Sequence, residues 1–159
     1  WLNVLAMSGK SVQEIATEHW QTYGRHYYAR HDYDGLPAPA AEAVMQAFAG
    51  EIAQLPGQRV GDYTVTLADE FSYHDKLDGS IASGQGLRLV CGEQARIILR
   101  LSGTGTSGAT LRVYLERYER DPSALAWRTG EALAPLAGIA ERIGRIAELT
   151  GRRAPTLIT

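Results

Sequence analysis

A strand pattern on each side of one glycine-rich loop is the feature that most constrains how this chain can fold. Residues 96–101 are rich in isoleucine and leucine, and residues 109–116 alternate strictly between apolar and polar side chains. Such alternation is typical of a β-strand with one buried face and one exposed face. The connection, residues 102–108, is short and contains three glycines. Together these segments predict an antiparallel β-hairpin.

Pairing the two strands about Thr106 predicts which residues oppose one another. On one face the predicted pairs are apolar: Ile97 with Leu115, Leu99 with Val113, and Leu101 with Leu111. The other face carries Arg100 directly opposite Arg112, and Arg96 opposite Glu116. Like charges directly opposite each other are unfavourable, so the Arg100–Arg112 pair favours an anion bound between the two guanidinium groups.

The loop itself has the chemistry of an anion-binding loop. Glycine permits positive φ, which lets backbone N–H groups point toward one place, and serine and threonine hydroxyls add further donors. An arginine fork can donate two parallel hydrogen bonds to a phosphate. The candidate phosphate-binding residues are Arg100, Ser102, Gly103, Thr104, Gly105, Thr106 and Arg112.

Two other interpretations of the loop stay open. Residues 103–108 match the G-x-G-x-x-G pattern of dinucleotide sites. That motif opens a helix, whereas a strand pattern follows here, and the lysine of a Walker loop is missing. The second alternative is a glycine-rich hairpin without any ligand, since the same composition also serves turn chemistry.

Four stretches of the sequence resemble, in the same order, the C-terminal domain of the phosphoglucomutases, in the α-D-phosphohexomutase superfamily. They are residues 73–80, residues 85–89, residues 100–112 and residues 150–159. The third stretch, Arg-Leu-Ser-Gly-Thr-Gly-Thr-Ser-Gly-Ala-Thr-Leu-Arg, is the most specific, because it is similar to the phosphate-binding loop of that family.

The resemblance implies an activity for a longer protein. Such a protein would interconvert glucose 1-phosphate and glucose 6-phosphate through glucose 1,6-bisphosphate, with Mg, and this chain would hold the phosphate that is not transferred. The family's catalytic phosphoserine, Mg-binding loop and sugar-recognition loop have no counterpart here. We therefore expect no catalytic residue, no metal ligand and no cofactor in this chain, and no activity from it alone. The alternatives are a phosphomannomutase or phosphoglucosamine mutase domain, or a non-catalytic phosphate-binding module.

Composition limits the partners and the compartment. The chain has 159 residues, 45% of them hydrophobic, which suits one cored domain with an appendage. Its net charge of -2 gives no general attraction to nucleic acid or membrane, so we expect neither partner. The expected partners are the phosphosugar and upstream domains of the same chain. The single cysteine, Cys91, lies in an apolar run and fits packing in a reducing, cytoplasmic location.

The resemblance implies that residues 1–36 are the end of a preceding domain and a connector. The chain also starts within an apolar segment, which suggests a piece of a longer protein. Two helices should open the chain, the second beginning at the capping residue Ser11 and ending at Gly24. The aromatic, partly basic segment 25–34 is expected to be a packed connector, with binding of single-stranded nucleic acid as the alternative. Proline and alanine in residues 35–40 predict a linker.

Residues 37–159 are expected to form the C-terminal phosphate-binding domain. Helical periodicity predicts helices over residues 40–55 and 130–149. Alternation predicts further strands over residues 63–67 and 86–91. The fold class is therefore α+β, with an antiparallel sheet of about four strands, two helices packed on one face, and an N-terminal helical extension. The resemblance implies a topology like that of the TATA-binding protein.

Residues 68–84 form a polar excursion between two of these strands. His74, Asp75 and Asp78 in it could be metal ligands or an acid–base cluster. Their spacing matches no known ligand set, and Asp78-Gly79 is a strong turn signal. We therefore favour a turn.

Overall fold

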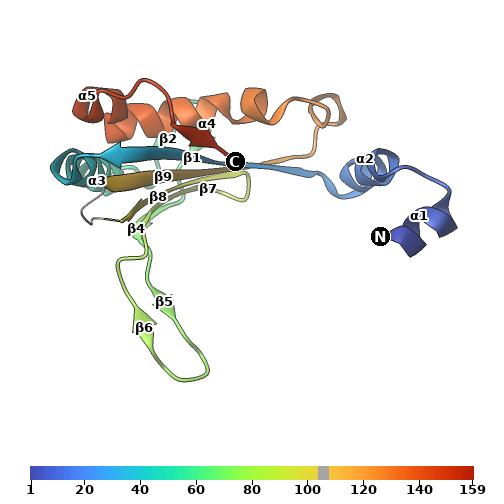
Figure 1. Ribbon diagram of the computed structural model, residues 1–159, viewed down its shortest axis with the longest axis horizontal. Coiled ribbons are helices and arrows are strands. Elements are labelled where there is room, and N and C mark those ends of the chain that lie inside the picture. Colours follow the sequence, from blue (N-terminus) through green and yellow to red (C-terminus); the bar gives the residue numbers. More distant parts are fainter. Residues whose placement is uncertain (104–107) are drawn as a thin grey trace.

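The computed structural model describes residues 1–103 and 108–159 (Figure 1). Its helices are α1 (Leu2–Ser8), α2 (Val12–Tyr23), α3 (Ala38–Ile52), the 3₁₀ turn η1 (Pro122–Ala124), α4 (Thr129–Gly144) and α5 (Ile146–Thr150). Its strands are β1 (Arg25–Leu36), β2 (Arg59–Val60), β3 (Tyr63–Thr64), β4 (Leu67–Glu70), β5 (Tyr73–His74), β6 (Ile81–Ala82), β7 (Leu87–Cys91), β8 (Ala95–Ser102), β9 (Ala109–Glu119) and β10 (Leu157–Ile158).

One antiparallel sheet with helices on a single face forms the body of the molecule. The strand order is β10-β1-β9-β8-β7-β4, and every pairing in it is antiparallel. Helices α3, α4 and α5 cover one face, and no helix of the described residues lies on the other face, called the helix-free face below (Figure 1). The predicted α+β class is confirmed. The sheet has six strands rather than about four, because β1 and β10 extend it beyond the central hairpin.

The register predicted for the central hairpin is confirmed. The structure pairs Ile97 with Leu115, Leu99 with Val113, and Leu101 with Leu111 on the face that meets the helices. On that face Leu99 and Leu111 are fully buried, and they pack in one core with Val44 and Phe48 of α3 and Leu136 of α4. The core therefore fixes the register of the hairpin, since shifting one strand by one residue would turn its apolar side chains away from the helices.

The expected connector at residues 25–34 is wrong, because these residues belong to strand β1, between β9 and β10. The helix-facing positions of β1 include tyrosines rather than aliphatic residues, so the alternation was hidden. Tyr27 is buried, and its hydroxyl donates a hydrogen bond of 2.6 Å to the carbonyl of Ala124. The expected linker is also wrong, because Pro37 is the N-cap of α3. Pro39 lies in the first turn of α3, where a helix needs no backbone N–H donor, so both prolines are compatible with the start of a helix.

Two other element boundaries differ from the prediction. The strand expected at residues 63–67 is divided: β3 pairs with β2 in a separate ladder, and β4 joins the main sheet. The helix expected at residues 130–149 is divided at Arg145, whose φ of 51° is left-handed. Left-handed backbone ends a right-handed helix, so the apolar face continues in the separate α5.

The excursion between β4 and β7 is a hairpin of β5 and β6 that projects from the helix-free side of the sheet (Figure 1). The predicted turn at its tip is confirmed. The Asp75 carboxylate accepts from the N–H of Leu77 at 2.7 Å, and the Asp78 carboxylate accepts from the N–H of Ser80 at 2.8 Å. Nowhere in residues 1–103 and 108–159 do three or more His, Cys, Asp or Glu residues form a group that could hold a metal.

The helical extension at the N-terminus is confirmed, with the capping box of Ser11 and Glu14 and the end of α2 at Gly24. Neither α1 nor α2 has a buried residue. Trp1, Leu2 and Met7 are largely exposed, and the extension lies beside the sheet domain rather than on its core (Figure 1).

Side chains alternate along β8 between the helix-facing and the helix-free face, and we expect substitutions on the two faces to differ in their effect on the free energy of unfolding. Replacing the fully buried Leu99 by alanine removes core contacts and should lower the free energy of unfolding by about 2–5 kcal/mol. Ile98 is the matched control, because it is adjacent in the strand but lies on the helix-free face. Ile98→Ala should cost less than half as much in urea unfolding. Equal losses for the two variants would contradict the register.

Candidate functional site

Arg100 and Arg112 are direct cross-strand neighbours at the loop end of β8 and β9. Both lie on the helix-free face, because Leu99, Leu101, Leu111 and Val113 face the helices. Arg100 is exposed and Arg112 is partly buried. The structure thus places the two predicted arginines opposite each other on the helix-free face of the sheet.

These two arginines differ from the other three on the same face. Arg30 pairs with Asp32 at 2.8 Å, Arg88 pairs with Asp69 at 2.7 Å, and Arg96 pairs with Glu116. Among the described residues, neither Arg100 nor Arg112 has a carboxylate within ion-pair distance. Two arginines at directly opposite positions of neighbouring strands, without a counter-charge among the described residues, favour an anionic ligand.

Arg112 has the more constrained environment of the two. Its Nε is buried and has no hydrogen-bond partner in the part of the chain that the structure describes. The cross-strand neighbour on its other side is Asp32, but both carboxylate oxygens of Asp32 accept from Arg30 at 2.8 Å. A buried donor without a partner costs about 1–3 kcal/mol, which an anion accepting from it would offset.

Both described ends of the loop have left-handed backbone. Gly103 has φ of 65° and Gly108 has φ of 95°, values that glycine adopts without a steric penalty. A Cβ on Gly108 would lie 3.2 Å from Cα of Gly35, so Gly108 packs closely on the bulge of β1. Ser102 is paired with Thr110 at the base of the loop. The predicted residues Thr104, Gly105 and Thr106 lie outside the described residues.

Sequence reasoning missed two residues beside Arg100. The side-chain oxygen of Gln85 accepts a hydrogen bond from Nη2 of Arg100 at 3.4 Å. Gly86 lies against the backbone of Leu99 and the stem of Arg100. The available signal was a glycine at the start of a predicted strand, which often marks a close backbone approach.

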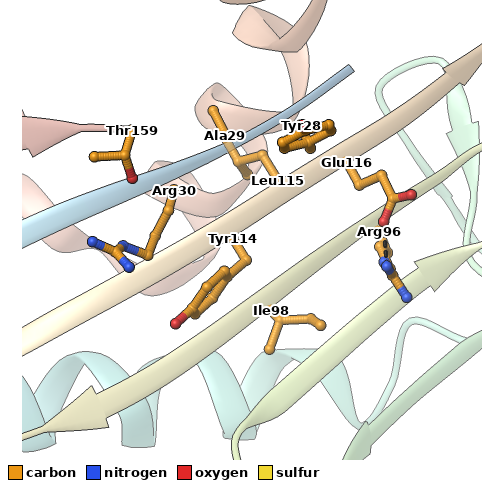
Figure 2. A pocket seen from close by; sticks show the side chains of 9 residues that line it. All are labelled: Tyr28, Ala29, Arg30, Arg96, Ile98, Tyr114, Leu115, Glu116 and Thr159. Carbon is orange, nitrogen blue, oxygen red and sulfur yellow. Dashed lines mark ion pairs between the residues drawn. The ribbon is translucent and has the colours of Figure 1, made fainter. Parts of the chain in front are cut away.

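A hollow of about 490 Å³ lies on the same face, one row of side chains away from the arginine pair (Figure 2). Tyr114 lies in it between Arg30 and Ile98. Its two arginines are already neutralised: Asp32 raises the pKa of Arg30, and Arg96 pairs with Glu116. The hollow is therefore a weaker candidate for a phosphate than Arg100 and Arg112.

Two further features bear on other site classes. Cys91 is buried, and this burial raises the pKa of its thiol, which suits packing and not nucleophilic chemistry. No helix in the described part of the chain is both long and apolar enough to cross a membrane.

Comparisons with known proteins agree with one another. A family model described as the C-terminal domain of phosphoglucomutase-1 matches residues 25–156. The whole chain is 45% identical to part of a phosphoglucomutase of Rhizobium radiobacter and 44% identical to part of a cytoplasmic phosphoglucomutase of Pisum sativum. It covers 29% of the first relative and 30% of the second, so it spans less than a third of their length.

A solved structure also matches over the full length of the chain. It is the open form of pp63/parafusin, an exocytosis-sensitive phosphoprotein and phosphoglucomutase from Paramecium. The TM-score is 0.88 at 38% identity, and the match covers 100% of this chain and 28% of that one.

The ion pair of Arg88 with Asp69 on the helix-free face predicts that the stability of the domain depends on pH. Arg88 donates two hydrogen bonds to Asp69, and these lower the pKa of that carboxyl group. The stabilisation is therefore present above the ordinary aspartate pKa of about 3.9 and is lost as pH falls through the lowered pKa. Because both groups are about one-third exposed, we expect Asp69→Asn to cost about 0.2–1 kcal/mol at pH 7.

The check is urea unfolding of both proteins at pH 7 and at pH 2. The difference should become smaller from pH 7 to pH 2, because Asp69 is increasingly protonated as pH falls. A difference of the same size at both pH values would show that the substitution acts through packing and not through the ion pair.

Proposed function

Because the chain belongs to the phosphoglucomutase family, we propose that it is the C-terminal domain of a full-length phosphoglucomutase and holds the substrate phosphate that is not transferred. The parent enzyme interconverts glucose 1-phosphate and glucose 6-phosphate. The observation that supports this role is the cross-strand pair Arg100–Arg112, which lacks a carboxylate partner among the described residues.

The chemistry of the reaction favours an anchor of this kind. Glucose 1,6-bisphosphate has to turn over between two half-reactions, so each phosphate in turn occupies the same anchor. Guanidinium forks, hydroxyls and backbone N–H groups recognise a phosphate without reading the sugar. The proposed phosphate-binding residues are Arg100, Ser102, Gly103, Thr104, Gly105, Thr106 and Arg112.

The remaining parts of the enzyme are proposed to lie in upstream domains of the same chain. These would supply the phosphoserine and the ligands of Mg. We also propose that α1 and α2 are the end of a preceding domain. Strand β1 belongs to the sheet, so the proposed boundary moves from residue 37 to Gly24. A cytoplasmic location is proposed from relatives named cytoplasmic phosphoglucomutases.

Two alternatives concern the parent protein. A phosphomannomutase or phosphoglucosamine mutase would use the same anchor, because a phosphate site does not select the sugar. A non-catalytic module would bind phosphate without any turnover. Comparing the full-length enzyme on glucose, mannose and glucosamine phosphates separates these alternatives.

We expect Arg100→Ala or Arg112→Ala to weaken binding of glucose 6-phosphate by the full-length enzyme by about 1.5–3 kcal/mol, the range for a hydrogen bond to a charged group. Arg96→Ala is the matched control, because Arg96 lies on the same strand and face as Arg100 but pairs with Glu116. It should leave the affinity nearly unchanged. KM and melting temperature of each variant are the measurements.

The assignment would be wrong if Arg96→Ala weakened binding as much as Arg100→Ala. It would also be wrong if phosphate left the side-chain NMR signals of Arg100 and Arg112 in the 159-residue chain unmoved. The Arg112 Nε is buried and has no hydrogen-bond partner among the described residues, so a phosphate that accepts from it should shift its NMR signal.

The chain alone should show no mutase turnover with glucose 1-phosphate and Mg. The described serines that contact a carboxylate do so in helix caps or in a turn. These are Ser11 with Glu14 at the start of α2, Ser123 with Asp121 at the start of η1, and Ser80 with Asp78 in the turn of the β5–β6 hairpin. None of these arrangements supplies an activated nucleophile. Turnover that survives repurification and is absent from an Arg112→Ala preparation would contradict this prediction.

A further inference from the structure

We propose that Gln85 and Gly86 are positioning residues that hold Arg100 in place for the phosphate. They lie in the neck of the β5–β6 hairpin, which is the place where Phe71 pairs with Gln85 and Gly86 as the hairpin leaves the sheet. This role rests on the proposed function, because Gln85 and Gly86 would support the same phosphate site. Neither residue needs to touch the ligand, because both act through the Arg100 side chain.

Gly86 leaves the space that the stem of Arg100 occupies. Its φ is +143°, a conformation that other residues rarely adopt. A Cβ at this position would lie 2.7 Å from the carbonyl oxygen of Leu99 and 2.8 Å from Cγ of Arg100. The first of these atoms is backbone in a sheet strand and cannot yield cheaply. A side chain on Gly86 would therefore displace Arg100 or the neck itself.

Gln85 connects the guanidinium to the hairpin. Its Oε1 accepts from Nη2 of Arg100 at 3.4 Å, while its Nε2 donates to the carbonyl of Ser83 at 3.3 Å. The acceptor is neutral, so it orients the guanidinium without cancelling its charge. A carboxylate in this place would form an ion pair with Arg100 and compete with phosphate.

The neck that carries both residues is held in place by the sheet. The backbones of Phe71 and Gln85–Gly86 exchange two hydrogen bonds, from the N–H of Phe71 to Gly86 at 2.7 Å and from the N–H of Gln85 to Phe71 at 2.9 Å. The ring of Phe71 packs under the guanidinium of Arg88, at 4.9 Å, and Arg88 is fixed by Asp69. Such a support holds the exposed Arg100 side chain in one orientation before phosphate binds. Less rotamer entropy is then lost on binding than for a free side chain.

The test is a titration of the 159-residue chain with inorganic phosphate, followed through the arginine side-chain NMR signals. Gln85→Met keeps the length of the side chain and removes the acceptor, and should weaken binding about threefold to tenfold. Gln94→Met is the matched control, because Gln94 is exposed in the turn at the opposite end of β8. It should leave the dissociation constant unchanged.

A double-mutant cycle separates positioning from a general loss of structure. If Gln85 acts through Arg100, adding Gln85→Met to Arg100→Ala should weaken phosphate binding no further. Full additivity of the two changes, or no effect of Gln85→Met alone, would overturn the positioning role while leaving the phosphate site intact. Absence of phosphate binding by the unchanged chain would overturn the site and the positioning role together.

Gly86→Ala gives a second, independent comparison. Its control is Gly79→Ala, because Gly79 also has positive φ, +74°, but a Cβ there would meet nothing within 4 Å. Both variants should lower the melting temperature through backbone strain, and only Gly86→Ala should weaken phosphate binding. Equal binding by both folded variants would overturn the role of Gly86. If Gly86→Ala does not fold, the result with Gln85→Met decides.

Discussion

The pairing of β8 with β9 is the constraint on which the rest of the structure depends. One register buries Leu99, Leu101, Leu111 and Val113 against the helices and brings Arg100 beside Arg112 on the opposite face. Because side chains alternate along a strand, core and site cannot be shifted independently. The burial of the apolar face therefore provides the stability that keeps two like charges adjacent.

The five arginines on the helix-free face of the sheet fall into two groups. Arg30, Arg88 and Arg96 each pair with a carboxylate of the same face, so their charges are neutralised within the domain. Arg100 and Arg112 lie at the loop end, where the neighbouring Asp32 is already occupied by Arg30. Of these five arginines, only Arg100 and Arg112 have no carboxylate partner among the described residues. A local excess of positive charge of this kind is what an anion site on an acidic protein requires.

Segments distant in sequence converge on that place. The bulge of β1 at Gly35 packs on Gly108, and the neck of the β5–β6 hairpin lies against Arg100. The hairpin projects beyond the sheet on the helix-free side (Figure 1), which is also the side of the sheet that carries Arg100 and Arg112. The end of the β8–β9 pair that carries these arginines is thus contacted by both β1 and the hairpin.

The sequence by itself determined the hairpin register, the candidate arginines, the N-terminal capping box and the turn at Asp78-Gly79, because each depends on local spacing or local hydrogen bonds. It did not reveal β1, whose buried Tyr27 needs the carbonyl of Ala124, nor the division of the last helix at Arg145. It also missed Gln85 and Gly86. Those features were decided by tertiary structure, because a strand with tyrosines on its buried face, or a glycine that makes room for Arg100, has meaning only once distant segments pack together.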